Sequence, residues 1–404
     1  MRNIIIAGGA NAGLSAAREL RLSGFDGSIQ VVDRDPRGPY RRPETSKGML
    51  DGRTTRAKAA IPWPEELQVE RFVGVTLTAL DPASRTVLIK TAAGTRAFPF
   101  DGLVIATGCE ARPSPFGPSI GGVHTLRDLE DSEAMRPDLD TAHRVVIIGG
   151  GFIGLEVASV ARGLGKDVTV VEAAPQPLAR LLGRGFGEYV AQRHRDRGVR
   201  LITDVTVKGL AAGPSGRVAS VVLSTGESLD ADVVLVAIGS APATRWLEGS
   251  GIDLHMGVSC DRTCAVPGVA GVVAAGDVAS WINPRYGRRM RVEHWTNAIE
   301  QGTYAARRLL GVHDPDGFAS VPYFWSDQYG VKLQSIGSTV GHDEAVVLEQ
   351  TDERLLVAYG REGRLVCVAG WNAGAVVMKQ RPLVLEGVPL DEVLTAVTAP
   401  QRSH

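Results

Sequence analysis

Two glycine-rich turns, Gly8–Gly13 and Gly149–Gly154, each stand between a continuously apolar segment and a stretch with helical periodicity. In a βαβ nucleotide-binding unit the first glycine permits a tight turn, and the second lets the backbone approach a pyrophosphate. The third glycine allows close packing of helix on strand, and the helix N-terminus holds the anion. Two such turns in one chain therefore predict two bound nucleotides.

The second turn has the complete pattern. Gly149, Gly151 and Gly154 occupy the three glycine positions, and Glu172 ends the next apolar segment. An acidic side chain at that place accepts a hydrogen bond from a ribose 2′-hydroxyl and repels a 2′-phosphate. Because no arginine directly follows Glu172, the sequence favours NADH over NADPH.

The first turn is imperfect, because Ala10 stands where the second glycine belongs. We expect its methyl group either to push the pyrophosphate outward or to be absorbed by a backbone shift. Asp33 ends the following strand and is the candidate ribose ligand. Asp35 is the alternative, since Arg34 between the two carboxylates leaves the register open.

Three further segments indicate a flavin. Lys47, at the end of residues 40–47, could face an isoalloxazine ring. Asp277, after the apolar residues 272–275, resembles the aspartate of a second flavin motif that binds the ribityl hydroxyls. A helix that begins within residues 291–298 can present its N-terminus to the pyrimidine end of the flavin. Candidate cofactor-binding side chains in this last segment are Glu293, His294 and Trp295.

The pattern of elements predicts an α/β fold with two Rossmann-like domains and a small α+β C-terminal domain. Continuous apolar strands of this kind are typical of parallel sheets that are buried on both faces. A Pro/Gly-rich stretch at residues 112–118 is expected to be a linker. The predicted division is a first part of an FAD-binding domain (1–113), an NADH-binding domain (114–240), the second part of the FAD-binding domain (241–319) and the C-terminal domain (320–404).

Composition excludes several classes. The net charge of −1 gives no global field for nucleic acid. No uncharged apolar run approaches the roughly 20 residues that span a bilayer, and the N-terminus lacks the features of a signal peptide. We therefore expect a cytoplasmic protein. The eight histidines have no metal-ligand spacing, so no metal is expected.

Together with residues 322–328 (Pro-Tyr-Phe-Trp-Ser-Asp-Gln), these segments resemble the FAD-dependent, NADH-linked ferredoxin reductases of bacterial oxygenase systems. This is the putidaredoxin reductase-like group, which has a glutathione reductase-type fold. The resemblance covers essentially the whole chain. The Phe-Trp-Ser-Asp-Gln element discriminates, because many flavoproteins share the glycine motifs. It implies that electrons pass from NADH through FAD to a [2Fe–2S] ferredoxin that serves a haem monooxygenase or a Rieske dioxygenase.

The resemblance also implies site residues. Those that it places at FAD are Gly8, Ala12, Gly13, Arg42, Lys47, Ala106, Thr107, Gly108, Arg127 and Asp277. Those that it places at NADH are Gly149, Gly151, Ile153, Gly154, Glu172, Gly239 and Glu293. Trp325 would lie by the flavin ring. Lys47 and Glu156 match an ion pair near flavin N5, so these three residues are the candidate catalytic residues.

The sequence departs from the family pattern at three places. These are Ala10, Glu44-Thr45 in place of Pro-Leu, and Arg34 in the ribose-binding turn. We still expect FAD to bind.

A ferredoxin is usually acidic, so a basic docking patch is expected near the flavin edge. The candidates are Arg285, Arg288, Arg289 and Arg291, to which Lys379 and Arg381 could add. The expected assembly is a monomer or a weak homodimer, with no nucleic-acid or membrane partner.

Two alternatives stay open. One is a rubredoxin reductase or NADH oxidase, and the other is a redox scaffold that resembles apoptosis-inducing factor. Disulfide chemistry is disfavoured, because the chain has neither a Cys-x-x-Cys nor a Cys-x4-Cys pair. Peroxide chemistry is disfavoured, because residues 34–60, just after the ribose turn, contain no cysteine. Cys260 and Cys264 are interpreted as reduced structural thiols.

Overall fold

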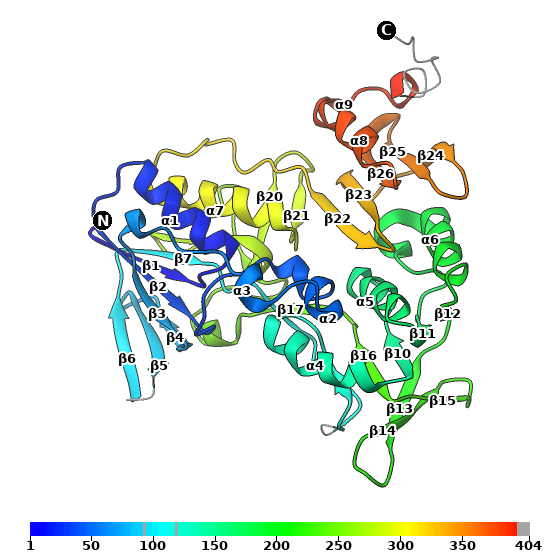
Figure 1. The fold of residues 1–404 in the computed structure, drawn as a ribbon. Coiled ribbons are helices and arrows are strands. Elements are labelled where there is room, and N and C mark those ends of the chain that lie inside the picture. The colour runs from blue at the N-terminus through cyan, green and yellow to red at the C-terminus, as the bar shows by residue number, and fades with distance from the viewer. Residues whose placement is uncertain (92–93, 118–119, 394–404) are drawn as a thin grey trace. The chain divides into compact units, whose positions relative to one another are not determined.

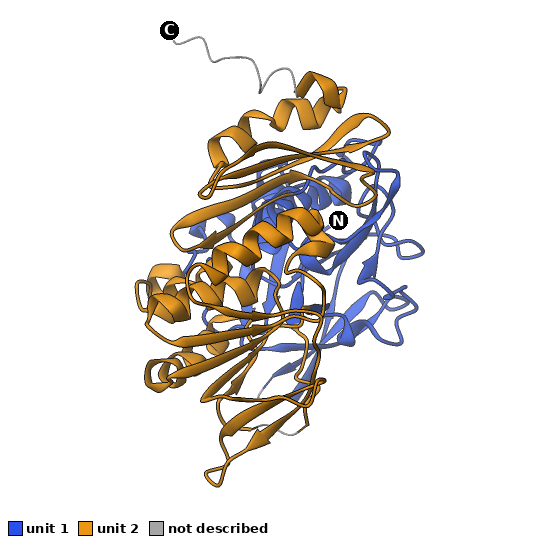
Figure 2. Ribbon diagram, turned by 90° about the vertical axis from the view of Figure 1, so that its right-hand side faces the viewer, with its two compact units in different colours: residues 1–41, 60–110, 240–322 blue, residues 42–59, 111–239, 323–404 orange. Residues whose placement is uncertain are grey.

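The computed structural model describes residues 1–91, 94–117 and 120–393 (Figure 1). The chain splits into two compact units, each assembled from three stretches of sequence (Figure 2). Unit 1 comprises Met1–Arg41, Ala60–Glu110 and Ser240–Pro322, and unit 2 comprises Arg42–Ala59, Ala111–Gly239 and Tyr323–His404. Pro118, within the predicted linker, and residues 394–404 of the predicted C-terminal domain lie outside the described residues.

A five-stranded parallel sheet forms the centre of unit 1. Its strands, in spatial order, are β19 (Val272–Ala274), β7 (Gly102–Ile105), β1 (Asn3–Ala7), β2 (Ser28–Asp33) and β3 (Glu70–Val73). The isoleucines at positions 4–6 are fully buried, as expected of a strand that is covered on both faces. The predicted parallel strands of the first Rossmann-like unit are therefore confirmed.

Helices α1 (Asn11–Leu22) and α7 (Trp295–Leu310) lie side by side in unit 1 (Figure 1). Their close approach requires a glycine at position 302, because a Cβ there would lie 2.2 Å from the backbone oxygen of Ala12. This contact brings the N-terminal half of α7 next to the first turn of α1.

Smaller sheets and single-turn helices complete unit 1, and the sequence patterns did not predict them. One sheet contains β4 (Thr76–Asp81), β5 (Thr86–Thr91) and β6 (Gly94–Pro99), and a second contains β18 (Val258–Ser259), β20 (Ala279–Asn283) and β21 (Arg288–Met290). The remaining short elements are η2 (Glu65–Leu67), η3 (Arg245–Leu247), η4 (Gly276–Val278) and the pair β8 (Cys109–Ala111) and β17 (Ser240–Pro242).

Unit 2 contains the second parallel sheet. Its strands, in spatial order, are β12 (Arg200–Ile202), β11 (Asp167–Val171), β10 (Arg144–Ile148), β16 (Val233–Val236) and β9 (Val123–His124). Its longer helices are α4 (Leu129–Thr141), α5 (Phe152–Gly163) and α6 (Ala179–Arg195). The shorter elements are η1 (Arg42–Glu44), α2 (Gly48–Asp51), α3 (Arg56–Ala59), β13 (Val207–Ala212), β14 (Val218–Leu223) and β15 (Ser228–Asp230).

The C-terminal part of unit 2 is an antiparallel sheet with two short helices, which confirms the predicted α+β character. Its strands, in spatial order, are β22 (Tyr323–Gln328), β23 (Val331–Gly337), β26 (Arg364–Trp371), β25 (Leu355–Arg361) and β24 (Glu344–Gln350), followed in sequence by α8 (Gly374–Lys379) and α9 (Arg381–Glu386). Apolar side chains of the sheet share one core with α6.

A kink in α6 fixes this packing. Gly183 has φ 77° and ψ 165°, which interrupts the helical hydrogen bonds. Hydroxyl groups of the sheet domain replace them: Tyr359 donates to the Leu182 carbonyl, and Thr339 donates to the Leu181 carbonyl. The backbone groups that the kink releases are thus satisfied by the domain that packs there.

The predicted four-part domain division is not decided by these two units, and it stays a prediction. Residues 42–59 group with unit 2, although the sequence reading placed them in the first FAD-binding segment. Among the helices that the structure describes, none is both long enough and apolar enough to cross a bilayer.

Candidate cofactor-binding sites

The first glycine turn follows β1 in unit 1. Gly8 has φ 103°, and a Cβ there would lie 2.3 Å from the Ala106 carbonyl oxygen. A Cβ at Gly13 would lie 1.9 Å from the carbonyl oxygen of Gly8. Both contacts are shorter than non-bonded atoms allow, so this turn can form only with glycine at these positions.

The second turn follows β10 in unit 2 and has the same geometry. Gly149 has φ 112°, and a Cβ there would lie 2.3 Å from the Ala237 carbonyl oxygen. A Cβ at Gly154 would lie 2.1 Å from the carbonyl oxygen of Gly149. The two units thus present two equivalent strand–turn–helix elements.

The backbone at the second glycine position does not itself require glycine. Ala10 has φ −76° and Gly151 has φ −79°, values that any L-residue adopts. A Cβ built on Gly151 meets no atom within 4 Å. The backbone at Ala10 is therefore unstrained, and the response of a bound pyrophosphate to its methyl group stays a prediction. Neither residue has a side chain that can cap its helix, so the first-turn N–H groups of α1 and α5 suit an anion.

A carboxylate at the end of the second strand binds each turn. Asp33 Oδ2 accepts a 2.8 Å hydrogen bond from the Gly9 amide. Glu172 Oε2 accepts a 2.6 Å bond from the Gly150 amide in the same way. Asp33, not Asp35, therefore occupies the position equivalent to Glu172. Burial raises the pKa of Asp33 above its ordinary value.

Asp35 has a different local role. Its Oδ1 accepts a 2.8 Å hydrogen bond from the Arg37 amide and so closes the turn after β2. The side chain of Arg34 pairs with Glu110. A contact of Asp33 or of Asp35 with a ribose remains a prediction.

Other candidate flavin residues in unit 1 follow β7 and β19. Ala106 continues from β7, Thr107 Oγ1 donates a 2.9 Å hydrogen bond to the Ala243 carbonyl, and Gly108 has φ 70°. Asp277 lies in η4, next to the start of α7. His294 is the N-cap residue of that helix and Trp295 is its first residue. Their contacts with a cofactor are untested.

Arg291 bridges three polar groups at this place. Its Nη1 lies 3.1 Å from Cys109 Sγ, 3.1 Å from the Asp277 carbonyl oxygen and 2.7 Å from Glu293 Oε1. Ser240 donates a 2.6 Å hydrogen bond to the other oxygen of Glu293. The sequence reading placed Arg291 in a docking patch and did not single out Cys109.

The side chains of Cys109, Asp277 and Glu293 bring three potential metal ligands within 4.8 Å of one another. The guanidinium group of Arg291 already supplies a positive charge to this cluster. The histidine spacing had given no indication of such a grouping, because its members are a thiol and two carboxylates from distant segments.

The candidate catalytic pair lies in unit 2. Lys47 Nζ is 2.8 Å from Glu156 Oε2, and the two side chains are only 15% and 5% exposed. Glu156 lies on α5, two residues after the last glycine of the second turn. Lys47 is the N-cap residue of α2. The ion pair is therefore buried, and each charge depends on the other for its stability.

Two serines surround Glu156, and the sequence did not indicate that either of them contacts it. The Ser46 hydroxyl donates to Oε2, and the Ser326 hydroxyl donates to Oε1 over 2.6 Å. The Asp327 amide also donates to Oε1, over 3.3 Å. Hydrogen bonds of this kind favour the ionised carboxylate. Ser46 and Ser326 come from segments far apart in sequence, so no local pattern could reveal them.

The remaining candidates in unit 2 have local structural roles. Arg42 Nη1 donates a 2.7 Å hydrogen bond to the carbonyl of Arg127. Trp325 is half-buried, and its ring centre lies 6.0 Å from that of Tyr323. Gly239 has φ 100°. Ile153, in the first turn of α5, is 37% exposed, so it is available to a ligand.

The Glu44-Thr45 departure is accommodated in the same segment. Thr45 is buried, and its hydroxyl donates a 2.8 Å hydrogen bond to the Arg42 carbonyl. The Thr45 carbonyl accepts a 2.9 Å bond from the Ser132 hydroxyl. The polar threonine is thus satisfied where the family has leucine.

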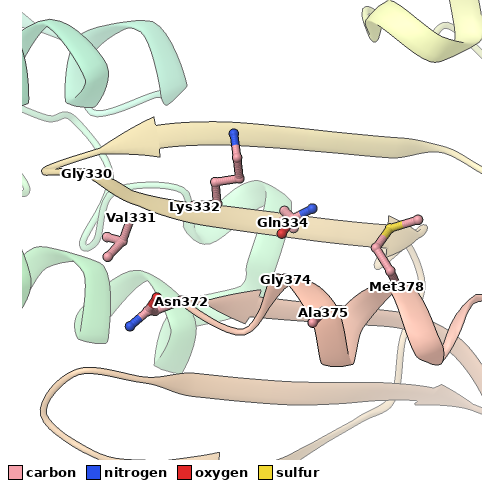
Figure 3. Close-up of a pocket in the computed structure, with 8 residues that line it drawn as sticks. All are labelled: Gly330, Val331, Lys332, Gln334, Asn372, Gly374, Ala375 and Met378. Carbon is pink, nitrogen blue, oxygen red and sulfur yellow. The ribbon is translucent and has the colours of Figure 1, made fainter.

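The structure also contains an open hollow of about 530 Å³ between β23 and α8 (Figure 3). Lys332, Gln334 and Met378 are among its lining residues, and Lys332 forms an ion pair with Asp327. None of the residues predicted to bind a cofactor lines this hollow.

The cysteines interpreted as structural are deeply buried. Burial raises the pKa of the Cys260 thiol to about 12, and it raises the pKa of Cys264 well above the ordinary value. A thiol in such surroundings is a poor nucleophile.

A fully buried histidine, His194, and a half-buried one, His294, predict a pH-dependent stability. Burial lowers the pKa of His194 and of His294 to about 4, from an ordinary 6.5. Below pH 6.5 these histidines bind protons in the unfolded chain but stay neutral in the folded chain. The free energy of unfolding should thus fall as the pH drops from 6.5 to 4, by on the order of 3 kcal/mol per histidine. Urea titrations across this range measure it.

His194→Gln should flatten that slope, whereas the exposed His255→Gln should leave it unchanged. An equal slope in all three proteins would contradict burial of a neutral His194.

Residues 2–302 match the model of the pyridine nucleotide-disulphide oxidoreductases, and residues 323–401 match the reductase C-terminal domain. The chain belongs to the pyridine nucleotide-disulphide oxidoreductase family. This membership confirms the predicted fold class and the oxidoreductase assignment.

Individual relatives cover nearly the whole chain. The chain is 35% identical to the 5,5'-dehydrodivanillate O-demethylase ferredoxin reductase subunit of Sphingobium sp., over 96% of this chain and 94% of the relative. It is 33% identical to a rubredoxin-NAD(+) reductase of Pseudomonas putida, over 91% and 95%. Its fold matches the reductase in the crystal structure of the covalent putidaredoxin reductase–putidaredoxin complex with a TM-score of 0.91, 29% identity and coverage of 97% and 95%.

Proposed function

We propose that this chain is an NADH-dependent ferredoxin reductase that contains FAD. This proposal is supported most strongly by one combination of features: two equivalent nucleotide-binding turns, and a match to the reductase C-terminal domain at residues 323–401. When bound, FAD supplies the chemistry that takes a hydride from NADH and delivers single electrons. The acceptor is a [2Fe–2S] ferredoxin, which passes electrons to a haem monooxygenase or a Rieske dioxygenase.

The residues present fit two dinucleotides. The first turn, with Asp33, binds the FAD adenosine and pyrophosphate, and Asp277 binds the ribityl chain. The second turn, with Glu172, binds NADH. The proposed domains are residues 1–113 and 241–319 for FAD, 114–240 for NADH and 320–404 for the C-terminal domain. The other proposed cofactor contacts are those of Ala12, Arg42, Ala106, Thr107, Gly108, Arg127, Ile153, Gly239, Glu293, His294, Trp295 and Trp325.

Glu172 is the proposed source of coenzyme preference. Replacing it with alanine removes the acceptor for the ribose 2′-hydroxyl and the charge that repels a 2′-phosphate. Glu172→Ala should raise the KM for NADH about tenfold and narrow its advantage over NADPH. Steady-state reduction of ferricyanide with each coenzyme measures both effects, and an unchanged KM ratio would contradict this role.

The proposed docking surface for ferredoxin includes the arginines around the β20–β21 hairpin. Arg289 Nη1 donates to the carbonyls of Cys260 and Ser280, so its charge is also tied to the hairpin itself. Arg285 is exposed and Arg288 is half-buried. These two are therefore better test positions than Arg289 or Arg291.

The double variant Arg285→Gln, Arg288→Gln should lower kcat/KM for an acidic ferredoxin about fivefold at low salt, and less at high salt. Ferricyanide reduction by NADH should be unchanged, because that oxidant needs no protein docking. Equal ferredoxin kinetics in variant and parent would remove these two residues from the docking surface.

The rubredoxin alternative is tested by offering both acceptors. With purified protein, NADH and FAD, a [2Fe–2S] ferredoxin should be reduced with a higher kcat/KM than a rubredoxin. The opposite order would favour a rubredoxin reductase. Reduction of oxygen alone would favour an oxidase, and NADH binding without turnover would favour the scaffold that resembles apoptosis-inducing factor.

A further inference from the structure

A chain of polar side chains continues inward from Glu156. Ser326 Oγ lies 2.6 Å from Glu156 Oε1 and 3.0 Å from Gln328 Nε2. Gln328 Oε1 lies 2.8 Å from His194 Nε2, and His194 Nδ1 lies 2.8 Å from the Tyr329 hydroxyl oxygen. The chain therefore crosses from α5 through β22 to α6 and ends at the β22–β23 turn.

Water is excluded from the middle of this chain. The residues Ser326, Gln328 and His194 are each 0% exposed. Polar groups at such depth remain stable only when hydrogen bonds replace their hydration. Loss of any one of these hydrogen bonds would therefore leave a buried polar group without a partner.

The ionised state of Glu156 fixes the direction of every bond. A carboxylate only accepts, so Ser326 gives its single proton to Glu156 and must accept from the Gln328 amide NH₂. The Gln328 oxygen then faces His194 and requires a proton on Nε2. Nδ1 is left as an acceptor for the Tyr329 hydroxyl.

We propose that Ser326, Gln328, His194 and Tyr329 are positioning residues that form one hydrogen-bond chain polarised toward Glu156. The chain holds the carboxylate in its orientation toward Lys47. Its link to flavin reduction rests on the function proposed above, whereas its polarity does not.

The alternative polarity belongs to a protonated Glu156. In that state Glu156 donates to Ser326, Ser326 donates to a rotated Gln328 amide, and the amide NH₂ donates to His194 Nε2. His194 would then carry its proton on Nδ1 and donate it to Tyr329. A proton on His194 Nδ1 therefore requires a Glu156 protonated on Oε1, because any state in which Oε1 accepts from Ser326 places the histidine proton on Nε2. The ammonium of Lys47, 2.8 Å from the carboxylate, favours the ionised state.

The far end of the chain is held by the helix that carries Glu156. Tyr329 has φ 54°, and its amide donates a 2.6 Å hydrogen bond to Ser159 Oγ on α5. Its ring packs edge-on against His194, with centroids 4.9 Å apart, and the Arg197 guanidinium lies 4.6 Å from the ring centre. Ser159 follows Glu156 by three positions on α5. Both ends of the hydrogen-bond chain are therefore attached to the same helix.

The direct test is the tautomer of His194, measured by two-bond ¹H–¹⁵N NMR correlation on the purified protein labelled with ¹⁵N-histidine. His194→Gln assigns the signal. At pH 7 the proposal requires a neutral ring with its proton on Nε2. A proton on Nδ1, or a doubly protonated ring, would overturn it. This readout needs neither NADH nor ferredoxin, so it stands apart from any failure of the proposed function.

A matched pair of variants tests the link to flavin reduction. Tyr329→Phe removes the hydroxyl that donates to His194, whereas Tyr359→Phe removes a more deeply buried hydroxyl that donates to the Leu182 carbonyl of the same helix. Tyr329→Phe should slow NADH-driven flavin reduction about threefold. Tyr359→Phe should slow flavin reduction less than Tyr329→Phe does, even if the two variants lose equal stability. Equal slowing in both variants, at equal melting temperatures, would contradict a positioning role.

Discussion

Glu156→Gln should slow NADH-driven flavin reduction by about a hundredfold and lower the free energy of unfolding by about 3 kcal/mol. The amide removes the negative charge that balances the buried Lys47 ammonium. It also places an N–H donor among the hydroxyls of Ser46 and Ser326, which both donate to the carboxylate. Stopped-flow absorbance of the flavin and urea denaturation measure the two effects.

The exposed Glu188→Gln on α6 is a matched control for this change and should behave like the parent. Joining Glu156→Leu with Lys47→Met should recover part of the stability, because neither charge is then left unpaired. If Glu156→Gln matched Glu188→Gln in both measurements, the ion pair would have no part in the reaction.

Gly154→Ala should abolish measurable NADH binding and destabilise unit 2 by about 3 kcal/mol or more. The new Cβ would lie 2.1 Å from the carbonyl oxygen of Gly149, so the turn and the first residues of α5 must move. Because the same helix carries Glu156, flavin reduction should fail with it. Isothermal titration with NADH and thermal melting measure the effect.

Gly151→Ala is the control for the same substitution three residues earlier. Its Cβ enters open space at a φ of −79°, and Ala10 already occupies the equivalent place in unit 1. This variant should fold like the parent, and any loss of NADH affinity should come from the new methyl group meeting the pyrophosphate and not from a disturbed turn. Equal damage from both alanines would contradict the geometry of the turn.

The sequence predicted the parts of the fold that have a local pattern. Gly8, Gly13, Gly149 and Gly154 were recognisable because one backbone geometry demands glycine at a fixed spacing. The strands beside these glycines were predictable because their sequences are continuously apolar. The antiparallel strands β4–β6 and β13–β15 were missed, since their half-exposed residues alternate weakly.

The candidate site was predictable only where a motif marked it. Lys47 and Glu156 were paired through a family resemblance, because the separation of the two residues in sequence contains no information about their distance. Ser46 and Ser326 are ordinary serines until folding brings them to one carboxylate. His194 has no sequence signal either, because its neighbours in space come from the β22–β23 hairpin.

Arg291 shows the opposite limitation. A run of arginines near a nucleotide-binding domain indicates a basic surface, and the sequence therefore predicts a docking patch that includes Arg291. In the structure its guanidinium is instead directed at Cys109 and Glu293. Charge counts in sequence do not reveal which charges are neutralised within the fold.

Electron transfer from NADH, through FAD, to a ferredoxin is tested by an anaerobic titration with NADH. The sample contains the FAD-loaded protein and an excess of oxidised [2Fe–2S] ferredoxin, and absorbance and electron paramagnetic resonance follow the reduction. Each NADH should yield two reduced ferredoxins, since a hydride carries two electrons and each cluster accepts one. Reduction of the flavin with no reduced ferredoxin would contradict it.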